Sequence, residues 1–402
     1  MGLAYSVFRG LIAIVFILGT AYLLSNNKKG IKWRIPLYGL GVNIVLINLI
    51  LHTTPGQAIF LYAGRAVEKF VSFSFEGSEF VFGSIYMDNR LSFLFVGLIP
   101  LVFFGAFIAL LYHYGIIQRI IKAISYFLIK VFKLSGVEAM GVCSNMLLGQ
   151  SEGSIVIGPY IPKLTDSELF MIMSSGMACV SGTLLYAYAT MGADLSYVIA
   201  ASIISAPCSV IIAKMIFPET ASKEEIIEAE TKELKIYSGN ALEALGQGAV
   251  NGAKIVANVV IMLLAFIGII ELLDFLVSVV SFGHFTFDSI IGYIFYPIAF
   301  LIGVPDADIH SFALLFGKKT CFNEFIAYGS LKSFTFTPKG FLMICFALTG
   351  FANLSSIAIQ MGCYGAQYPP IRVKVAKLGL KALIAAVLAN LLSSSLAGMF
   401  FI

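Results

Sequence analysis

The sequence predicts an all-α polytopic membrane protein with about eight transmembrane helices and two opposed re-entrant helical hairpins, arranged as an inverted repeat. Three observations lead to this prediction. Hydrophobic residues make up 59% of the 402 residues and charged residues only 12%, whereas about a quarter of a soluble domain is charged. Apolar runs long enough to cross about 30 Å of hydrocarbon recur along the chain. Two further apolar segments are interrupted near their middle.

The long apolar runs are the candidate spans. They cover residues 6–24, 36–53, 92–113, 168–190, 196–217, 250–274, 340–362 and 380–402. The first run lacks an Ala-x-Ala cleavage site, so we expect a retained span rather than a signal peptide. Polar residues and glycine interrupt the fourth run at 181–183 and the seventh at 350–353. These two spans are therefore predicted to be broken helices.

Basic residues indicate the orientation of the chain. They cluster at 28–34, 119–133, 223–235 and 372–381, after the first, third, fifth and seventh runs. If every run crosses once, the four clusters share one side, and their Lys and Arg content predicts that this side is the cytoplasm. Both termini are then expected outside. Residues 58–85 mix apolar and charged types, which predicts a helix lying in the membrane interface.

The two interrupted segments are 134–165 and 291–332. The first is broken at 147–154 and the second at 302–308 by glycine, proline and polar residues. Each half is too short to span a bilayer, so we predict hairpins that enter and leave on one side, covered by protein or lining a watery cavity. The spacing repeats, because 29 residues separate Glu152 from Ser181 and also Glu324 from Asn353. Interrupted segments at corresponding places in two halves indicate an inverted-repeat transporter.

Two carboxylates lie within the hairpins, Glu152 and Glu324. A charge at membrane depth costs about 3 kcal/mol or more, so such residues normally face a cavity, a ligand or an ion path. The structural alternative is a protonated carboxyl that only joins two helices. Lys318 and Lys319 precede Glu324 and could either neutralise it or reach the interface. Asp306 and Asp308 are expected to be helix N-caps.

The polar side chains beside the breaks indicate the kind of ligand. They are Asn145, Gln150, Ser151, Asn323, Asn353, Ser355 and Ser356. Carboxylates accept hydrogen bonds from vicinal hydroxyls, amides pair with the edges of bases, and an aromatic ring such as that of Phe351 packs on a sugar or base. The set suits a neutral, hydroxyl-rich ligand with a flat ring. Neither hairpin contains Arg, so an anionic ligand fits poorly.

Other function classes find little support. The basic residues form no single patch, so no nucleic-acid partner is expected. The scattered cysteines are expected to be small buried hydrophobes, and the histidines lack metal-ligand spacing. No nucleophilic triad or phosphate-binding loop is recognisable in the sequence. We therefore expect no enzyme and no cofactor.

Three motifs resemble those of the concentrative nucleoside transporters in their short bacterial form. They are GQSE at 149–152, NEF at 323–325 and GFANLSSI at 350–357. The resemblance covers about residue 85 to the C-terminus. It implies a homotrimer in the bacterial inner (plasma) membrane, in which a transport domain moves against a trimeric scaffold. The implied parts are N-terminal spans with an interfacial helix, a first transport part, a cytoplasmic linker, a scaffold span with its outer connection, and a second transport part. Their bounds are 1–133, 134–217, 218–249, 250–290 and 291–402.

The resemblance also implies the roles of individual residues. Gln150 and Glu152, with Ser151 between them, would contact the nucleobase, partly through water. Glu324, Asn353 and Ser356 would hold the ribose hydroxyls. Phe351 would pack against the nucleoside, and Leu184 would line the base pocket. Gly149 and Thr183 resemble the pattern of members that accept purines as well as pyrimidines.

The coupling cation stays open between Na+ and H+. A sodium site carries over at Asn145, Cys179 and the backbone carbonyls of Leu148 and Val180. Cys179 stands where sodium-coupled members have a serine, and a thiol is a poor ligand for a hard cation. Glu152 or Glu324 could instead carry a proton.

We expect a symporter that imports nucleosides by alternating access. The alternative is a symporter of the same architecture for another small neutral solute such as a nucleobase. A nucleobase lacks the ribose that Glu324, Asn353 and Ser356 would hold, so the nucleoside is preferred. An intramembrane enzyme and a channel are further, weaker hypotheses.

Overall fold

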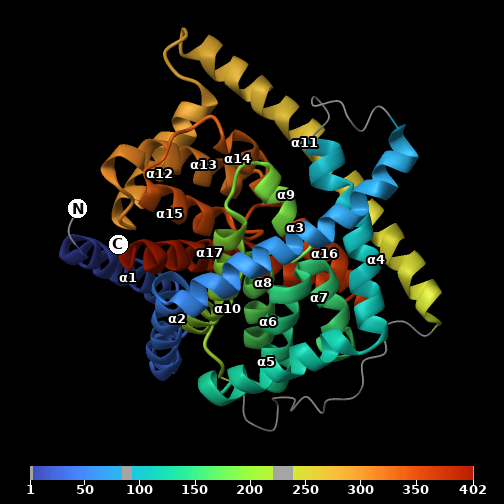
Figure 1. Cartoon of the computed structure of the whole chain (residues 1–402). Coiled ribbons are helices and arrows are strands. Elements are labelled where there is room, and N and C mark those ends of the chain that lie inside the picture. Colours follow the sequence, from blue (N-terminus) through green and yellow to red (C-terminus); the bar gives the residue numbers. More distant parts are fainter. Residues whose placement is uncertain (1–2, 84–92, 221–238, 402) are drawn as a thin grey trace.

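A computed structural model describes residues 3–83, 93–220 and 239–401, and every regular element in these ranges is helical (Figure 1). Six helices in this part of the chain are long and apolar enough to cross a membrane. They coincide with six of the predicted spans. The fourth and seventh predicted spans are broken helices, as the interrupted sequence indicated.

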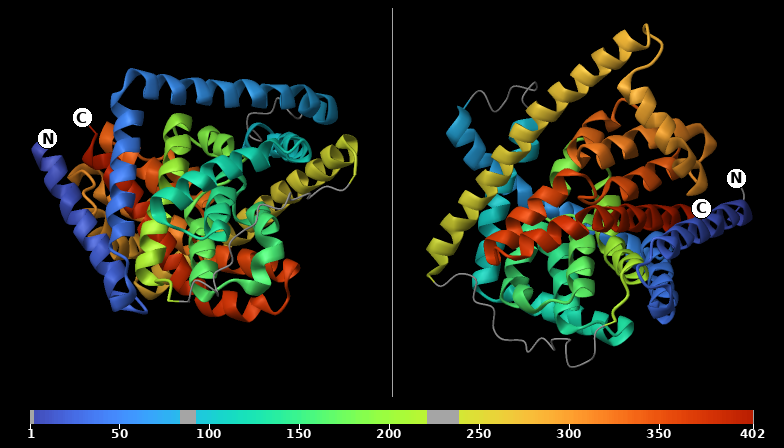
Figure 2. Two further views of the ribbon diagram at one scale, coloured as in Figure 1. Left: turned by 90° about the horizontal axis from the view of Figure 1, so that it is seen from below. Right: turned by 180° about the vertical axis from the view of Figure 1, so that it is seen from behind.

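The N-terminal elements include the predicted interfacial helix. They are α1 (Leu3–Leu23), η1 (Lys28–Gly30), α2 (Arg34–His52) and α3 (Thr54–Phe82). The chain turns sharply at Thr53, which is extended and whose hydroxyl accepts a hydrogen bond from the Gly56 amide. Figure 2 (left) shows α3 leaving the end of α2 and running crosswise to it along one side of the molecule. This crossing direction is the one expected of a helix that lies in the interface while α2 spans.

A second amphipathic helix was not predicted. The π-helical segment η4 (Phe93–Leu98) leads into α4 (Pro100–His113), and α5 (Ile116–Phe132) follows. The basic cluster at 119–133 therefore lies mostly on a helix instead of in a plain loop. Buried residues recur on one face of α5, at Ile117, Ile121, Leu128 and Phe132. This spacing is the helical period of an amphipathic surface helix.

The first repeat begins with the predicted hairpin. Its elements are α6 (Gly136–Leu148), α7 (Gln150–Ile157), η5 (Gly158–Lys163), α8 (Asp166–Ala178), α9 (Leu185–Thr190) and α10 (Leu195–Ile216). The hairpin breaks at Gly149, inside the predicted range. Gly149 has φ 87° and ψ 175°, a region that is essentially open to glycine only. One residue thus separates the two arms.

The second hairpin lies later in the chain than predicted. The interruption at 302–308 follows α12 (Phe287–Leu301), contains the short η6 (Asp306–Asp308) and does not form the tip. The hairpin consists of α13 (Ile309–Cys321) and α14 (Glu324–Leu331), with its tip at 322–323. The prediction was wrong because this tip contains no glycine or proline. Its signal is a cap, since the Asn323 side chain accepts a hydrogen bond from the Ile326 amide at 3.0 Å.

The rest of the second repeat mirrors the first. The broken helix consists of α15 (Pro338–Leu348) and α16 (Ser355–Gln367), and α17 (Ile371–Met399) is the last span. In both repeats a hairpin is followed by a broken helix and then by a long apolar helix. The order of elements therefore supports the inverted repeat inferred from sequence.

The helix α11 (Ala241–Val280) has 40 residues and is about 60 Å long at 1.5 Å per residue. It runs along the outer edge of the molecule (Figure 1) and begins inside the predicted linker 218–249, of which 221–238 lies outside the described residues. It packs closely on α4, because a Cβ on Gly105 would lie 2.6 Å from the Gly248 carbonyl oxygen. Small residues allow such close approach between membrane helices.

Contacts show which ends of the helices share a face. The Asn26 amide, after α1, donates to the Ile216 carbonyl oxygen at the end of α10 at 2.9 Å. At the opposite ends, the His52 ring lies 2.6 Å from the Phe400 carbonyl oxygen. Both termini lie on one side in Figures 1 and 2. The chain ends therefore lie opposite the first basic cluster.

Side chains close the C-terminal ends of the two interrupted helices. The Asn390 amide nitrogen donates to the carbonyl oxygen of Ala178, the last residue of α8, at 2.8 Å. The fully buried Lys319 ammonium donates at 2.7 Å both to the Ala347 carbonyl oxygen, in the last turn of α15, and to Asn390 Oδ1. Helix C-termini carry partial negative charge and unpaired carbonyls. Lys319 therefore compensates the end of α15 directly, and it holds the Asn390 side chain that binds the end of α8.

Charged residues near Lys319 in the sequence form ion pairs. Lys318 pairs with Asp288 at 2.6 Å, and Arg9 pairs with Asp306 at 3.7 Å. Asp308 stands at the N-cap position of α13, but the predicted hydrogen bond from the helix to its side chain is not formed. Its carboxylate makes no cap bond to α13 and accepts from the amide of Thr337, which caps α15, at 3.1 Å.

We expect Lys319→Met to lower the free energy of unfolding by about 3 kcal/mol or more, because hydrogen bonds to charged groups contribute about 1.5–3 kcal/mol each and the two oxygens lose their donor. Lys318→Met is the matched control and should cost less than about 1 kcal/mol, as partly exposed ion pairs contribute little. Thermal unfolding of the purified proteins in detergent measures both. Equal losses for the two variants would contradict the role of Lys319.

Candidate functional site

One cavity of about 340 Å³ collects all the residues predicted to bind substrate. It lies where the two hairpin tips and the two helix breaks meet the side of α11. The predicted residues in its lining are Gln150, Ser151, Glu152, Leu184, Glu324, Phe351, Asn353 and Ser356. They come from both repeats and are up to about 200 positions apart in the chain.

The first hairpin brings Gln150, Ser151 and Glu152 to the cavity in the first turn of α7. Its tip packs against the break between α8 and α9. The Gly182 amide donates to the Leu147 carbonyl oxygen at 3.3 Å, and a Cβ on Gly149 would lie 2.9 Å from the Ser181 Cβ. Glycine at the tip therefore permits the close approach that places the three side chains.

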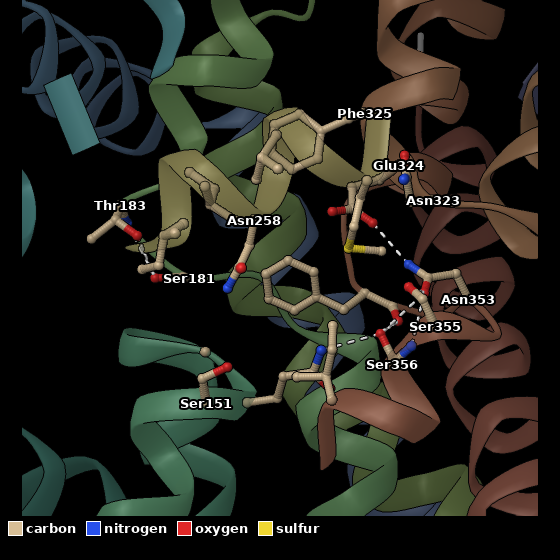
Figure 3. Close-up of a pocket in the computed structure, with 18 of the residues that line it drawn as sticks. Ser151, Ser181, Thr183, Asn258, Asn323, Glu324, Phe325, Asn353, Ser355 and Ser356 are labelled. Carbon is tan, nitrogen blue, oxygen red and sulfur yellow. Dashed lines mark hydrogen bonds between the residues drawn. The ribbon is translucent and has the colours of Figure 1, made fainter. Parts of the chain in front are cut away.

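The second hairpin presents a carboxylate that is held from two sides. Glu324 is the first residue of α14 and is 3% exposed. Its Oε2 accepts from the Asn353 side-chain amide at 2.9 Å, and its Oε1 accepts from the Tyr188 hydroxyl at 3.3 Å. Figure 3 shows Glu324 and Asn353 pointing toward one another across the cavity wall. The charge thus has partners from the breaks or half-helices of both repeats.

The break between α15 and α16 turns polar groups inward. Asn353 Oδ1 accepts from the Ser355 hydroxyl at 2.6 Å and from the Ser356 amide at 3.0 Å. The Ser356 hydroxyl donates to the Phe351 carbonyl oxygen at 2.5 Å. Gly350, with φ 128°, starts this turn, and a Cβ there would lie 2.4 Å from the Ala178 carbonyl oxygen. The side chains at 353 and 356 are therefore fixed before any ligand binds.

The helix α11 supplies residues that sequence reasoning missed. Ile255, Asn258, Val259, Ile261 and Met262 line the cavity from this helix. Asn258 is an amide near the middle of the predicted span 250–274, and a polar residue inside a membrane span is a functional signal in its own right. A smaller cavity of about 60 Å³ adjoins the first, shares Glu152 and Ile255 with it, and continues between α4 and α11.

The residues of the predicted sodium site lie at the first hairpin tip. Asn145 and Leu148 belong to the end of α6, and Cys179 and Val180 begin the break that the tip contacts. Asn145 is fully buried, and its amide nitrogen donates to the Ile172 carbonyl oxygen and to Ser175 Oγ, both at 2.9 Å. Its Oδ1 oxygen is buried with no hydrogen-bond partner among the described residues. A buried unpaired oxygen suits a cation.

The residues that line the cavity are of the kinds that bind a small ligand. Two carboxylates, several amides and hydroxyls, and the ring of Phe351 surround the cavity, and no Lys, Arg or His lines it among the residues that the structure describes. A cavity of this size with a few convergent polar groups is typical of a small-molecule site. The carboxylate and amide oxygens favour a ligand that donates hydrogen bonds, for example through hydroxyls, and they disfavour an anion.

Comparisons with known proteins identify the family. Residues 197–398 match the family described as Na+ dependent nucleoside transporter C-terminus, residues 12–85 match its N-terminal counterpart, and residues 94–195 match a family described as nucleoside recognition. The chain is 38% identical to the uncharacterized transporter YutK of Bacillus subtilis (strain 168), over 98% of this chain and 100% of that protein. The chain belongs to the concentrative nucleoside transporter family. Members of this family transport nucleosides in a Na+-dependent manner and are not enzymes.

Similarity to characterised transporters extends over the whole fold. The chain is 30% identical to sodium/nucleoside cotransporter 2 of Rattus norvegicus, over 98% of this chain and 62% of that protein. It matches CNTnw in an inward-facing substrate-bound state with a TM-score of 0.91 and 34% identity, over 98% of both chains. A substituted CNTnw in an outward-facing state matches with a TM-score of 0.91 and 33% identity, also over 98% of both chains. CNTnw thus adopts the two states that alternating access requires.

Proposed function

We propose that this concentrative nucleoside transporter imports nucleosides across the bacterial plasma membrane by symport with Na+ or H+. The observation that carries the proposal is the single cavity in which Glu324, held by Asn353, lies near the amides and hydroxyls of the opposite hairpin. Hairpin tips on opposite repeats can open the cavity to one side at a time. Binding of cation and nucleoside then favours the closed hairpins.

The proposed binding mode divides the cavity in two. Glu324, Asn353 and Ser356 lie within one connected set of hydrogen bonds and hold the ribose hydroxyls. Gln150, Ser151 and Glu152 contact the base, with Leu184 lining that part of the cavity. Phe351 packs on the nucleoside. A free nucleobase leaves the ribose-binding groups unpaired, so it should compete poorly.

The proposed coupling site is the set Asn145, Leu148, Cys179 and Val180. The unpaired Asn145 Oδ1 supports a cation there, and the match to a Na+-dependent family favours Na+ over H+. Cys179 offers a thiol, which binds hard cations weakly. We therefore propose a low affinity for Na+ in this member.

We further propose a homotrimer with both termini outside. Apolar side chains are exposed along α11, including Leu264, Leu272 and Phe275, and lipid or neighbouring subunits can cover them. Light scattering in detergent should give about three times 43.5 kDa of protein, and a single-chain mass would refute the trimer.

A Phe401→Cys variant should react with an impermeant maleimide from outside intact cells. Labelling only after lysis would show that the C-terminus lies inside the cell.

We expect Glu324→Gln to reduce uridine uptake at least about 100-fold, because two hydrogen bonds from hydroxyls to a charged acceptor are weakened, each contributing about 1.5–3 kcal/mol. Glu79→Gln makes the same chemical change on the exposed side of α3 and should leave uptake unchanged. Initial rates in proteoliposomes, normalised to folded protein, measure the effect. Uptake at the wild-type rate in Glu324→Gln would refute the ribose role.

We expect Cys179→Ser to lower the Na+ concentration needed for half-maximal uridine uptake by about tenfold, because a hydroxyl suits a hard cation better than a thiol. Cys345→Ser, at another buried cysteine, is the control and should leave the Na+ dependence as it is. Uptake under imposed Na+ or H+ gradients provides both curves. An identical Na+ response in Cys179→Ser and wild type would exclude this position from the cation site.

A further inference from the structure

A continuous chain of hydrogen bonds runs behind the base-binding side of the cavity. Gln360 Nε2, on α16, donates to the Met173 carbonyl oxygen of α8 at 2.9 Å and to Gln150 Oε1 at 3.1 Å. Gln150 Nε2 donates to Ser356 Oγ at 3.1 Å. The Ser356 hydroxyl donates to the Phe351 carbonyl oxygen at 2.5 Å. We call these contacts the amide chain.

The direction of every bond in the amide chain is fixed by its ends. The backbone carbonyl oxygens of Met173 and Phe351 can only accept hydrogen bonds. Gln360 must therefore turn its nitrogen to Met173, and the same nitrogen then meets the oxygen of Gln150. If either amide were reversed, two acceptors or two donors would face each other in a buried place, at a cost of about 1–3 kcal/mol.

The surroundings are built around these two amides. Gln360 and Ser356 are fully buried, and Gln150 is 3% exposed. Gly176 on α8 makes room for them, since a Cβ there would lie 3.0 Å from Gln360 Nε2 and 3.1 Å from the Gln150 Cβ. Gln360 Oε1 is buried with no hydrogen-bond partner among the described residues. The orientation of Gln360 is thus kept even though its own oxygen is left unpaired.

This orientation decides what Gln150 offers to a ligand. Ser356 lines the cavity and Gln360 does not, so the nitrogen of Gln150 lies on the cavity side and its oxygen faces away. One hydrogen of that nitrogen goes to Ser356, and the other remains for a ligand. We propose that Gln360 is a positioning residue that presents Gln150 to the nucleobase as a hydrogen-bond donor. The transporter then selects bases that carry an acceptor, such as a ring carbonyl, at this point.

The proposal rests on the proposed function and predicts a pattern of selectivity. Replacing the matching carbonyl oxygen by sulfur, a weaker acceptor, should lower the apparent affinity of the wild type about tenfold, which corresponds to one hydrogen bond of about 1.4 kcal/mol. Gln360→Met retains the length of the side chain and frees the Gln150 amide to rotate. In this variant the loss of apparent affinity caused by the sulfur substitution should be about threefold or less.

The experiment is competition of labelled uridine uptake by 2-thiouridine, 4-thiouridine and 2′-deoxyuridine, each expressed relative to unlabelled uridine within the same variant. Such ratios do not depend on the amount of folded transporter. Tyr364→Phe is the matched control, because it removes a buried hydroxyl, one turn further along α16, that has no hydrogen-bond partner in the part of the chain that the structure describes. Its profile should equal that of the wild type, and the 2′-deoxyuridine ratio should be the same in all three proteins.

The outcomes separate the two proposals. A wild type without saturable uridine uptake would refute the proposed function itself. A wild type that transports uridine but treats both thio analogues like uridine would show that no donor is presented to a base carbonyl. A thio penalty that persists in Gln360→Met would show that Gln360 does not position Gln150. Either of the last two results overturns the inference and leaves the transport function intact.

Discussion

The hydrogen bond between Glu324 and Asn353, at 2.9 Å, is the contact on which the site depends. A carboxylate at membrane depth is tolerated only where partners or a ligand compensate for its lost hydration. The second hairpin carries the acid, and the broken helix carries the amide. The two residues can meet only if the tip of the second hairpin packs against the break between α15 and α16. The cavity forms at this point of contact.

Interrupted helices make such a meeting possible because they leave backbone and side-chain polar groups free at mid-molecule. Each interruption then has to be stabilised. Lys319 and Asn390 bind the C-terminal carbonyls of the two upstream half-helices, α15 and α8. Gln150, Glu324 and Ser356 line the cavity instead. Structural support and recognition at the breaks thus come from different side chains.

Much of this arrangement could be predicted from the sequence. Apolar runs of the right length predicted the spans, and polar interruptions with glycine predicted the tip at Gly149 and both broken helices. The family motifs predicted residues that line the cavity from the two hairpins and the second broken helix. The tip at 322–323 escaped prediction because no glycine or proline marks it, and the glycine and proline at 302–308 mark a different turn. Phe322 ends one helix arm and the Asn323 cap starts the next, without glycine or proline at either position.

Two other features depend on packing that the sequence does not reveal. Asn258 lies in an apolar run, and only the path of α11 beside the hairpin tips brings it to the cavity. The orientation of Gln150 follows from a carbonyl oxygen on α8 and an amide on α16, which are distant in the chain. Propensity and periodicity describe single elements. They carry no information on which faces of distant elements meet.

The most direct test of the account is an experimental structure of the transporter with uridine bound. The account predicts one nucleoside in the cavity of about 340 Å³, with its ribose hydroxyls within hydrogen-bond distance of Glu324 and Asn353 and its base toward Gln150. A nucleoside bound elsewhere, or with its base against Glu324 and its ribose against Gln150, would contradict it.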